Sequence, residues 1–271
     1  MFNKILRHTK NLLAFRSLVS FKDFSLIFFS LLIKIPAILK QRNLGPFFRK
    51  IDRNKMFTFK VKGEKIKLLG RHLGYITEIY LGNVYFTLPG FQLNSSDTVI
   101  DLGSDGGVFT VLAAKKTKKV IAVEANEEHV INLEKNLKDN NCLKKVKVIY
   151  GIIGLKSGLL SNPEERKKIF HKKEADIIYM KDILLDNKIT KVDFLKVDIE
   201  GSEFDLFQNN NEWLSKIEKI AMEIHPQFGN VKSLIQTIKD KGFRVNLVDL
   251  NKNVVDDLKE PGYLFAKKLK K

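Results

Sequence analysis

The sequence predicts an α/β fold in which a mostly parallel β-sheet carries helices on both faces. Short apolar or β-branched runs alternate with helical stretches from Thr98 to Lys241, as is typical of parallel strands joined by crossover helices. A glycine-rich turn follows the first run, and sheets of this kind bind ligands at the carboxyl ends of their strands. The 271 residues are enough for one substantial core and a smaller accessory segment.

The amino-acid composition excludes several classes of protein. With 44% hydrophobic and 29% charged residues, a disordered chain, a collagen-like repeat and a polytopic membrane protein are excluded. The single cysteine, Cys142, excludes a disulfide scaffold and a multi-thiolate metal site, and it fits a reducing compartment. We therefore expect a cytoplasmic protein.

Positive charge is concentrated before residue 61. Of the net charge of +17, residues 1–60 supply 13 Lys/Arg against two acids. The apolar run Phe24–Ile33 is shorter than the roughly 20 residues of a spanning helix, and its flanks do not fit a signal peptide. Two interpretations stay open: this run and a basic helix over about 4–19 pack on the main domain, or they lie peripherally on the anionic inner face of a membrane. No zinc-finger spacing, aromatic platform or recognition helix supports nucleic-acid binding.

We expect three regions along the chain. Residues 1–55 form the basic, apolar helical segment, residues 56–95 a β-hairpin and lead-in, and residues 96–271 the main domain. The hairpin is predicted from period-two alternation over Phe57–Leu69 about Gly63. Strands are predicted over Thr98–Leu102, Lys119–Val123, Lys145–Tyr150, Val192–Val197 and Ile217–Ile224, with Phe243–Val248 and Gly262–Ala266 as a closing antiparallel pair across the loop 251–261; helices are predicted over about 108–116, 126–140 and 231–241.

The first candidate site is the turn after the first strand, which reads Asp101-Leu-Gly103-Ser104-Asp105-Gly-Gly107. It is neither a Walker loop nor G-x-G-x-x-G, because Asp105 stands where the second glycine would fall. An acid two positions before the first glycine would repel a pyrophosphate. It suits a cationic group, such as the amine and sulfonium of S-adenosylmethionine. The alternative is a glycine-rich turn with no ligand.

A second acid ends the next strand. Glu124, followed by Ala125, lies 23 positions after Asp101, where a carboxylate can accept hydrogen bonds from both hydroxyls of a ribose. Its alternative role is that of a helix-entry acid favoured by the helix dipole.

Three acids crowd the end of the fourth strand. Asp198, Glu200 and Glu203 fall within six residues, and burying them at a cleft is costly unless they bind something. Alternatively, Glu203 starts a helix and Lys196 neutralises the cluster.

The fifth strand ends in Met222-Glu223-Ile224-His225. His225 is able to remove a proton from a hydroxyl near neutral pH. A purely structural histidine is the alternative.

Together these motifs resemble the FkbM family of S-adenosylmethionine-dependent methyltransferases, from about Gly74 onward. Glu78-Ile79-Tyr80 looks like the glutamate-containing segment that precedes the glycine turn in that family. The sequence departs from the family's D-x-G-A-N-x-G turn at Ser104 and Asp105. The matching stretches are V-I-D-L-G-S-D-G-G-V-F-T at Val99–Thr110, V-I-A-V-E-A-N at Val120–Asn126, D-F-L-K-V-D-I-E-G-S-E at Asp193–Glu203 and M-E-I-H at Met222–His225.

The resemblance implies a Rossmann-like class I methyltransferase with a mostly parallel seven-stranded sheet and an antiparallel last strand. It implies S-adenosylmethionine as cofactor and O-methylation of a sugar, glycan, lipid-linked or other small hydroxyl acceptor. The residues expected to bind the cofactor are Asp101, Gly103, Ser104, Gly107, Glu124 and Ala125, and those expected to bind the acceptor are Glu78, Glu200 and Glu203.

Methyl transfer from a sulfonium requires a group that collects the acceptor proton. Our hypothesis gives this role to His225 or Asp198, with Lys196 a weaker candidate. We expect no metal, although Asp198 and Glu200 are able to hold one.

Two other functions stay open. One is a nicotinamide-dependent oxidoreductase on the same sheet, whose G-x-G-x-x-G fingerprint is lacking here. The other is a non-catalytic membrane- or glycan-associated module. In a module that had lost its activity, the glycines of the turn or Glu124 should be the first residues to be replaced, and all of them are present.

Overall fold

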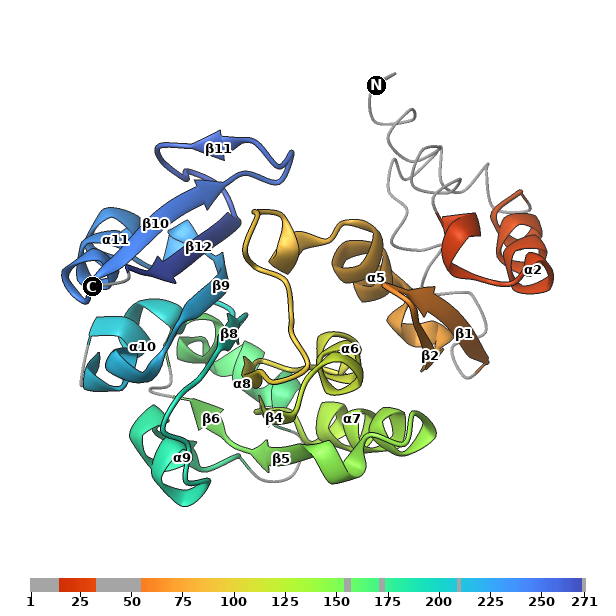
Figure 1. Ribbon diagram of the computed structural model, residues 1–271, viewed down its shortest axis with the longest axis horizontal. Helices are drawn as coiled ribbons and strands as arrows, with labels where there is room; N and C mark the ends of the chain where they lie inside the picture. The colour runs from red at the N-terminus through yellow and green to blue at the C-terminus, as the bar shows by residue number, and fades with distance from the viewer. Residues whose placement is uncertain (1–14, 33–54, 154–156, 171–173, 209–210, 270–271) are drawn as a thin grey trace.

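The computed structural model describes residues 15–32, 55–153, 157–170, 174–208 and 211–269 (Figure 1). Eight strands form one sheet in the order β11-β10-β12-β9-β8-β3-β4-β5. Their bounds are β3 (Thr98–Leu102), β4 (Lys119–Glu124), β5 (Val146–Tyr150), β8 (Phe194–Val197), β9 (Lys219–Ile224), β10 (Phe243–Val248), β11 (Val254–Val255) and β12 (Gly262–Lys268).

The sheet is doubly wound. The chain runs outward from β3 through β4 to β5 and then returns to place β8 on the other side of β3. Strand β12 lies antiparallel between β9 and β10, so the predicted closing pair is confirmed. The stretch 251–261, predicted as a loop, contains a short eighth strand, β11, which pairs with the end of β10. Strand order therefore reverses between β3 and β8, the position where such sheets bind ligands.

Helices cover both faces of the sheet and create two cores. Helices α6 (Val108–Lys116) and α7 (Glu127–Asp139) share one core. The other holds α9 (Met180–Asp186), α10 (Glu203–Gln208) and α11 (Val231–Asp240). Successive strand residues alternate between the two cores: Val99 and Val120 belong to the first, Ile100 and Ile121 to the second. This alternation is the two-sided burial expected of parallel strands.

The predicted hairpin is present and adds to the first core. Strands β1 (Met56–Val61) and β2 (Glu64–Leu69) pair across Lys62 and Gly63, which have φ values of 48° and 85°. Positive φ at both turn residues is the tight turn that suits the twist of a hairpin. The side chain of Asn140 holds β2, because its Nδ2 donates to the Lys67 carbonyl oxygen at 2.7 Å.

The described N-terminal residues lie against this hairpin. The ring of Phe15 packs edge-on to Phe59 at 6.0 Å, and α2 (Phe21–Leu32) contains most of the predicted apolar run. Phe21 and Phe29 of α2 are 75% and 61% exposed. No helix in the described residues is long and apolar enough to cross a membrane. Most of the basic helix predicted over 4–19 lies outside the described residues.

Candidate active site

A cavity of about 250 Å³ opens at the carboxyl ends of β3, β4 and β8. One part of its wall is polar and the other is apolar, which fits a ligand with a charged end and a flat base. The polar wall includes Gly103, Asp105, Glu124, His129, Asp198 and Glu200, and the apolar wall Ile152, Ile153, Leu159, Leu160 and Ile169.

The glycine turn, residues 103–107, reaches the cavity through Gly103 and Asp105. Gly103 has φ 72°, and a Cβ there would clash with the carbonyl oxygen of Asp198, so only glycine fits. Gly107 instead faces Leu133 of α7. Ser104 is buried, and its hydroxyl donates to the Val123 carbonyl oxygen at 3.1 Å. Ser104 and Gly107 therefore support the turn from behind and do not line the cavity.

Asp101 also lies behind the turn. It is completely buried, and its Oδ2 accepts a 2.6 Å hydrogen bond from Thr110. Its Oδ1 lies 3.2 Å from Nζ of Lys196, which donates to the Gly103 carbonyl oxygen at 2.6 Å. Burial disfavours the charge of Lys196, but Asp101 and Asp198 outweigh it and raise the pKa of Lys196. The carboxylate of Asp101 is thus paired inside the protein and ties the turn to β8.

Glu124, by contrast, faces the cavity. Its Oε2 accepts from the backbone N–H of Asp105 at 2.7 Å and its Oε1 from that of Asn126 at 2.8 Å. Burial raises the pKa of Glu124. Each carboxylate oxygen has a second lone pair, so Glu124 retains acceptor capacity for ligand hydroxyls. Ala125 lines the cavity beside it.

His129 was not among the sequence-predicted residues. Its Nδ1 lies 2.9 Å from Oδ1 of Asp105. Burial opposes the charge of Asp105, but His129 outweighs it and lowers the pKa of this carboxyl. Asp105 has φ 45°, a conformation that Asn and Asp tolerate best. Asp105 can therefore stand in for the family's asparagine, with its extra charge offset by His129.

The end of β8 carries Asp198 and Glu200 into the cavity wall. Oδ2 of Asp198 accepts a 2.9 Å hydrogen bond from the hydroxyl of Tyr85. Glu200 has φ 53°, and its side chain is 61% exposed. Both carboxylates are therefore held at the opening of the cavity and not in the core.

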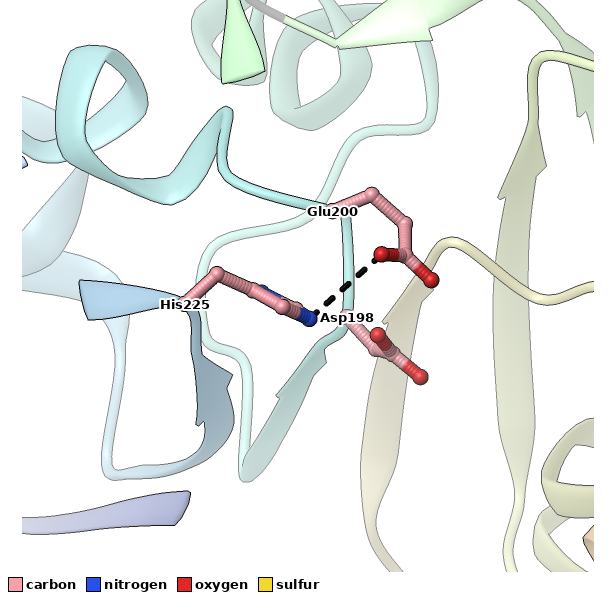
Figure 2. A group of neighbouring side chains, drawn as sticks. All are labelled: Asp198, Glu200 and His225. Atoms are coloured by element: carbon pink, nitrogen blue, oxygen red, sulfur yellow. Dashed lines mark ion pairs between the residues drawn. The ribbon is translucent and has the colours of Figure 1, made fainter. Parts of the chain in front are cut away.

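Glu203 points the other way and holds His225. It is completely buried, and its Oε1 accepts from the backbone N–H of His225 at 2.8 Å and lies 3.1 Å from Nδ1. With Nδ1 held, Nε2 of His225 turns toward Glu200, at 3.5 Å from its Oε2 (Figure 2). Burial disfavours the imidazolium, but Glu203, with Glu200 and Glu223, raises the pKa of His225 to about 9.

Glu78 comes from the π-helical turn η2 (Thr77–Leu81) and accepts a 2.7 Å hydrogen bond from the hydroxyl of Tyr263. Glu223, 4.0 Å from Nε2 of His225, is partly buried near Asp198 and Glu78. Burial and these two carboxylates raise the pKa of Glu223 to about 8. We call Asp198, Glu200, Glu223 and His225 the acidic mouth.

The doubly wound sheet with its inserted antiparallel strand, and a cavity at the strand-order reversal, define a Rossmann-like class I methyltransferase. The model of the methyltransferase FkbM domain matches residues 101–245, more than half of the chain, and the protein belongs to this family. It is a methyltransferase with S-adenosylmethionine as its methyl donor. The fold class, family and cofactor predicted from the sequence are thereby confirmed.

Several solved structures are similar to this chain at low sequence identity. Precorrin-6y C5,15-methyltransferase from Geobacter metallireducens is 13% identical, with a TM-score of 0.42 over 69% of this chain and 86% of that one. TrmK from M. capricolum, solved with S-adenosylhomocysteine, is 14% identical, with a TM-score of 0.40 over 65% and 64%. Precorrin 8w decarboxylase from Methanobacterium thermoautotrophicum is 16% identical, with a TM-score of 0.39 over 65% and 84%. No curated protein matches the sequence.

Proposed function

We propose that the protein transfers a methyl group to a hydroxyl oxygen of a sugar, glycan, lipid-linked or other small acceptor. The observation that carries this proposal is the position of the acidic mouth. Asp198 and Glu200 belong both to the mouth and to the wall of the cavity next to Gly103. An acceptor held by these carboxylates would therefore lie beside the bound cofactor, as in-line transfer requires.

The cavity wall divides in a way that fits the cofactor. The backbone at Gly103 is open to the methionine part, and Glu124 keeps lone pairs for the ribose hydroxyls. The apolar wall near Ile152 and Leu159 suits the adenine base. When bound, S-adenosylmethionine supplies an electrophilic methyl group on a positively charged sulfur.

The protein has to position the acceptor and collect its proton. With S-adenosylmethionine held at Gly103 and Glu124, transfer of its methyl group to the acceptor oxygen would break the carbon–sulfur bond and release a neutral sulfur. No acid is needed for that leaving group, but the hydroxyl proton must go to a base. Asp198 and His225 are our candidates for that base, because both project at the mouth. Glu203 holds the imidazole of His225 in place.

The first test is ligand binding by titration calorimetry with S-adenosylhomocysteine, NAD and NADP. We expect S-adenosylhomocysteine to bind and the nicotinamide cofactors not to bind. Transfer of labelled methyl to a panel of sugars and other polyols then tests the acceptor class. An alkali-stable ether product supports O-methylation, and methylation of amines alone would contradict it.

The base is tested with His225→Ala and Asp198→Asn at saturating cofactor. Loss of turnover with retained S-adenosylhomocysteine binding is expected for the residue that takes the proton. A rate close to that of the parent excludes that residue as the base.

We further propose that the basic segment before residue 56 places the enzyme on an anionic membrane at its cytoplasmic face. The exposed Phe21 and Phe29 of α2 and the excess of basic residues support this location. Co-sedimentation with vesicles that contain anionic lipid tests it. Binding that survives Phe21→Ser with Phe29→Ser, or that is absent in the parent, contradicts it.

A further inference from the structure

Three side chains of the acidic mouth converge on one point. Asp198, Glu200 and His225 each offer one ligand atom, and these atoms lie within 4.8 Å of one another (Figure 2). Atoms that bind the same cation at roughly 2.0–2.6 Å lie no more than about twice that distance apart. The three atoms are therefore close to the spacing that ligands of one ion adopt.

The imidazole is prepared for such a role. Glu203 fixes Nδ1 of His225 at 3.1 Å, which is the carboxylate–histidine arrangement that orients metal-binding imidazoles. The side chain is only 8% exposed, yet the contacts of Nε2 are long: 3.5 Å to Glu200 Oε2 and 4.0 Å to Glu223 Oε1. Both contacts are ion pairs within the cluster, so Nε2 is aimed at the point where the carboxylates meet.

The charge around this point is also unbalanced. Glu223 lies 4.0 Å from Nε2 of His225 and adds a third carboxylate to Asp198 and Glu200. Lys196 lies 3.8 Å from Asp198 but closer, at 3.2 Å, to Asp101, so its charge is already shared with the turn. The imidazole of His225 is likewise shared with Glu203, so the carboxylates outnumber the positive groups beside them, which favours a cation.

We propose that Asp198, Glu200 and His225 bind one divalent cation of the Mn²⁺ or Mg²⁺ class. The two carboxylates suit Mn²⁺ and Mg²⁺, the imidazole adds one neutral ligand, and three protein ligands leave coordination positions open. The role of this ion in methyl transfer rests on the proposed function. Asp198 and Glu200 line the cofactor cavity, so the open positions would take acceptor oxygens beside the methyl donor.

The site also narrows the acceptor class. A cation lowers the pKa of a hydroxyl that it binds and fixes its orientation. With Nε2 of His225 bound to the ion, Asp198 is the one of the two candidate bases that remains to take the proton. Open adjacent positions favour an acceptor with two neighbouring oxygens, such as the vicinal diol of a sugar. From the sequence no metal is expected, since it contains no H-x-x-x-H or paired-carboxylate ligand set; the ligands here follow two different strands, and only the fold brings them together.

The test is a titration of the full chain with Mn²⁺ in the absence of cofactor. Electron paramagnetic resonance measures the concentration of unbound Mn²⁺ at each step. We expect one Mn²⁺ per chain, displaced by excess Mg²⁺. Glu200→Gln and His225→Ala should each weaken binding by at least about tenfold. Glu134→Gln, the same chemical change at an exposed position of α7, should bind as the parent does.

Thermal unfolding in EDTA establishes that each variant is folded, and Asp198→Asn replaces any variant that is not. Absence of stoichiometric binding in the parent overturns the proposal. Equal binding by Glu200→Gln, His225→Ala and the parent overturns it as well, since the ion would then lie elsewhere.

Calorimetry with S-adenosylhomocysteine in EDTA separates this proposal from the proposed function. Binding of the nucleoside without any Mn²⁺ site overturns the metal site and leaves methyl transfer standing. Mn²⁺ binding without nucleoside binding supports the metal site and contradicts the proposed function.

Discussion

The glycine turn and the acidic mouth lie at the same edge of the sheet, and both depend on carboxylates, but they differ in where the compensating charge comes from. Behind the turn, Asp101 is completely buried and has its cation, Lys196, inside the protein. At the mouth, Asp198 and Glu200 share a cavity wall, and the positive groups near them, Lys196 and His225, are already paired with Asp101 and Glu203. The comparison teaches that an acidic residue of a motif has a structural role when a cationic side chain inside the protein is paired with it. Such a residue is available to a ligand when that cation is already paired elsewhere.

The largest effect is expected behind the turn. Lys196→Met would leave Asp101 buried without its cation, and removing one partner of a buried pair costs about 3–5 kcal/mol. Urea unfolding should show a loss of unfolding free energy of this size, partly recovered by adding Asp101→Asn. Lys191→Met, at a surface ion pair with 57% exposure, should cost under about 1 kcal/mol. A similar small loss for Lys196→Met would break the comparison.

Glu124 lies between the two cases, because it is buried but faces the cavity. Glu124→Gln removes a charged acceptor, and such hydrogen bonds are worth about 1.5–3 kcal/mol. Affinity for S-adenosylhomocysteine should fall roughly ten- to hundredfold by calorimetry. Glu127→Gln, at an exposed position nearby, should leave the affinity unchanged. Equal affinities would mean that Glu124 serves only the backbone amides of Asp105 and Asn126.

At the acidic mouth, replacing a charged side chain by a neutral one should hardly change the free energy of unfolding. Glu200 is 61% exposed and lies among other carboxylates, so Glu200→Gln should change the unfolding free energy by less than about 1 kcal/mol. The measurement is urea unfolding in EDTA beside Lys196→Met. A loss as large as that expected for Lys196→Met would show that the mouth is a structural network like the turn.

The smallest effect concerns the pair of His129 and Asp105. Asp105 and Glu124 outweigh burial and raise the pKa of His129, so its contribution is complete below the unfolded pKa and is lost as pH rises through the folded one. Because the imidazole is 41% exposed, water screens the pair and the contribution stays below about 1 kcal/mol. The parent should exceed His129→Gln in stability at pH 5.5, and the difference should shrink at pH 8.5. A difference that grows with pH would contradict this pairing.

Much of the fold was predictable because the hydrophobic pattern within each segment and the alternation of strands and helices along the chain indicate the same structure. Helix α6 has the predicted bounds 108–116, and Asn126 caps α7, accepting from the N–H of Glu128 at 2.9 Å. The fourth strand is shorter than predicted, since Val192 makes only an isolated bridge to Ile217. The stretch from residue 151 to 186 has no strong periodicity. The sequence analysis therefore missed β6 (Ile152–Ile153) and α8 (Pro163–Ile169), which supply the apolar wall of the cavity.

The site was only partly predictable, because a motif gives position along a strand but not the partners of a side chain. Gly103, Glu124, Asp198 and Glu200 do line the cavity. The motif could not reveal that Lys196, two residues before Asp198, would neutralise Asp101 from the neighbouring strand. Tyr85, His129 and Tyr263 approach the site acids from segments without any motif, so only tertiary structure brings them there.

The insertion of β12 between β9 and β10 has a consequence for folding. Both neighbours precede β12 in the chain, and β10 and β11 join the rest of the sheet only through it. The edge of β9 therefore stays unpaired until β12, alone or already paired with β10, is added to the sheet. Until then this edge exposes a row of unpaired amides and carbonyls, and exposed edges of this kind recruit strands from other chains. Rapid pairing of β12 with β9 would thus protect newly synthesised molecules from intermolecular aggregation.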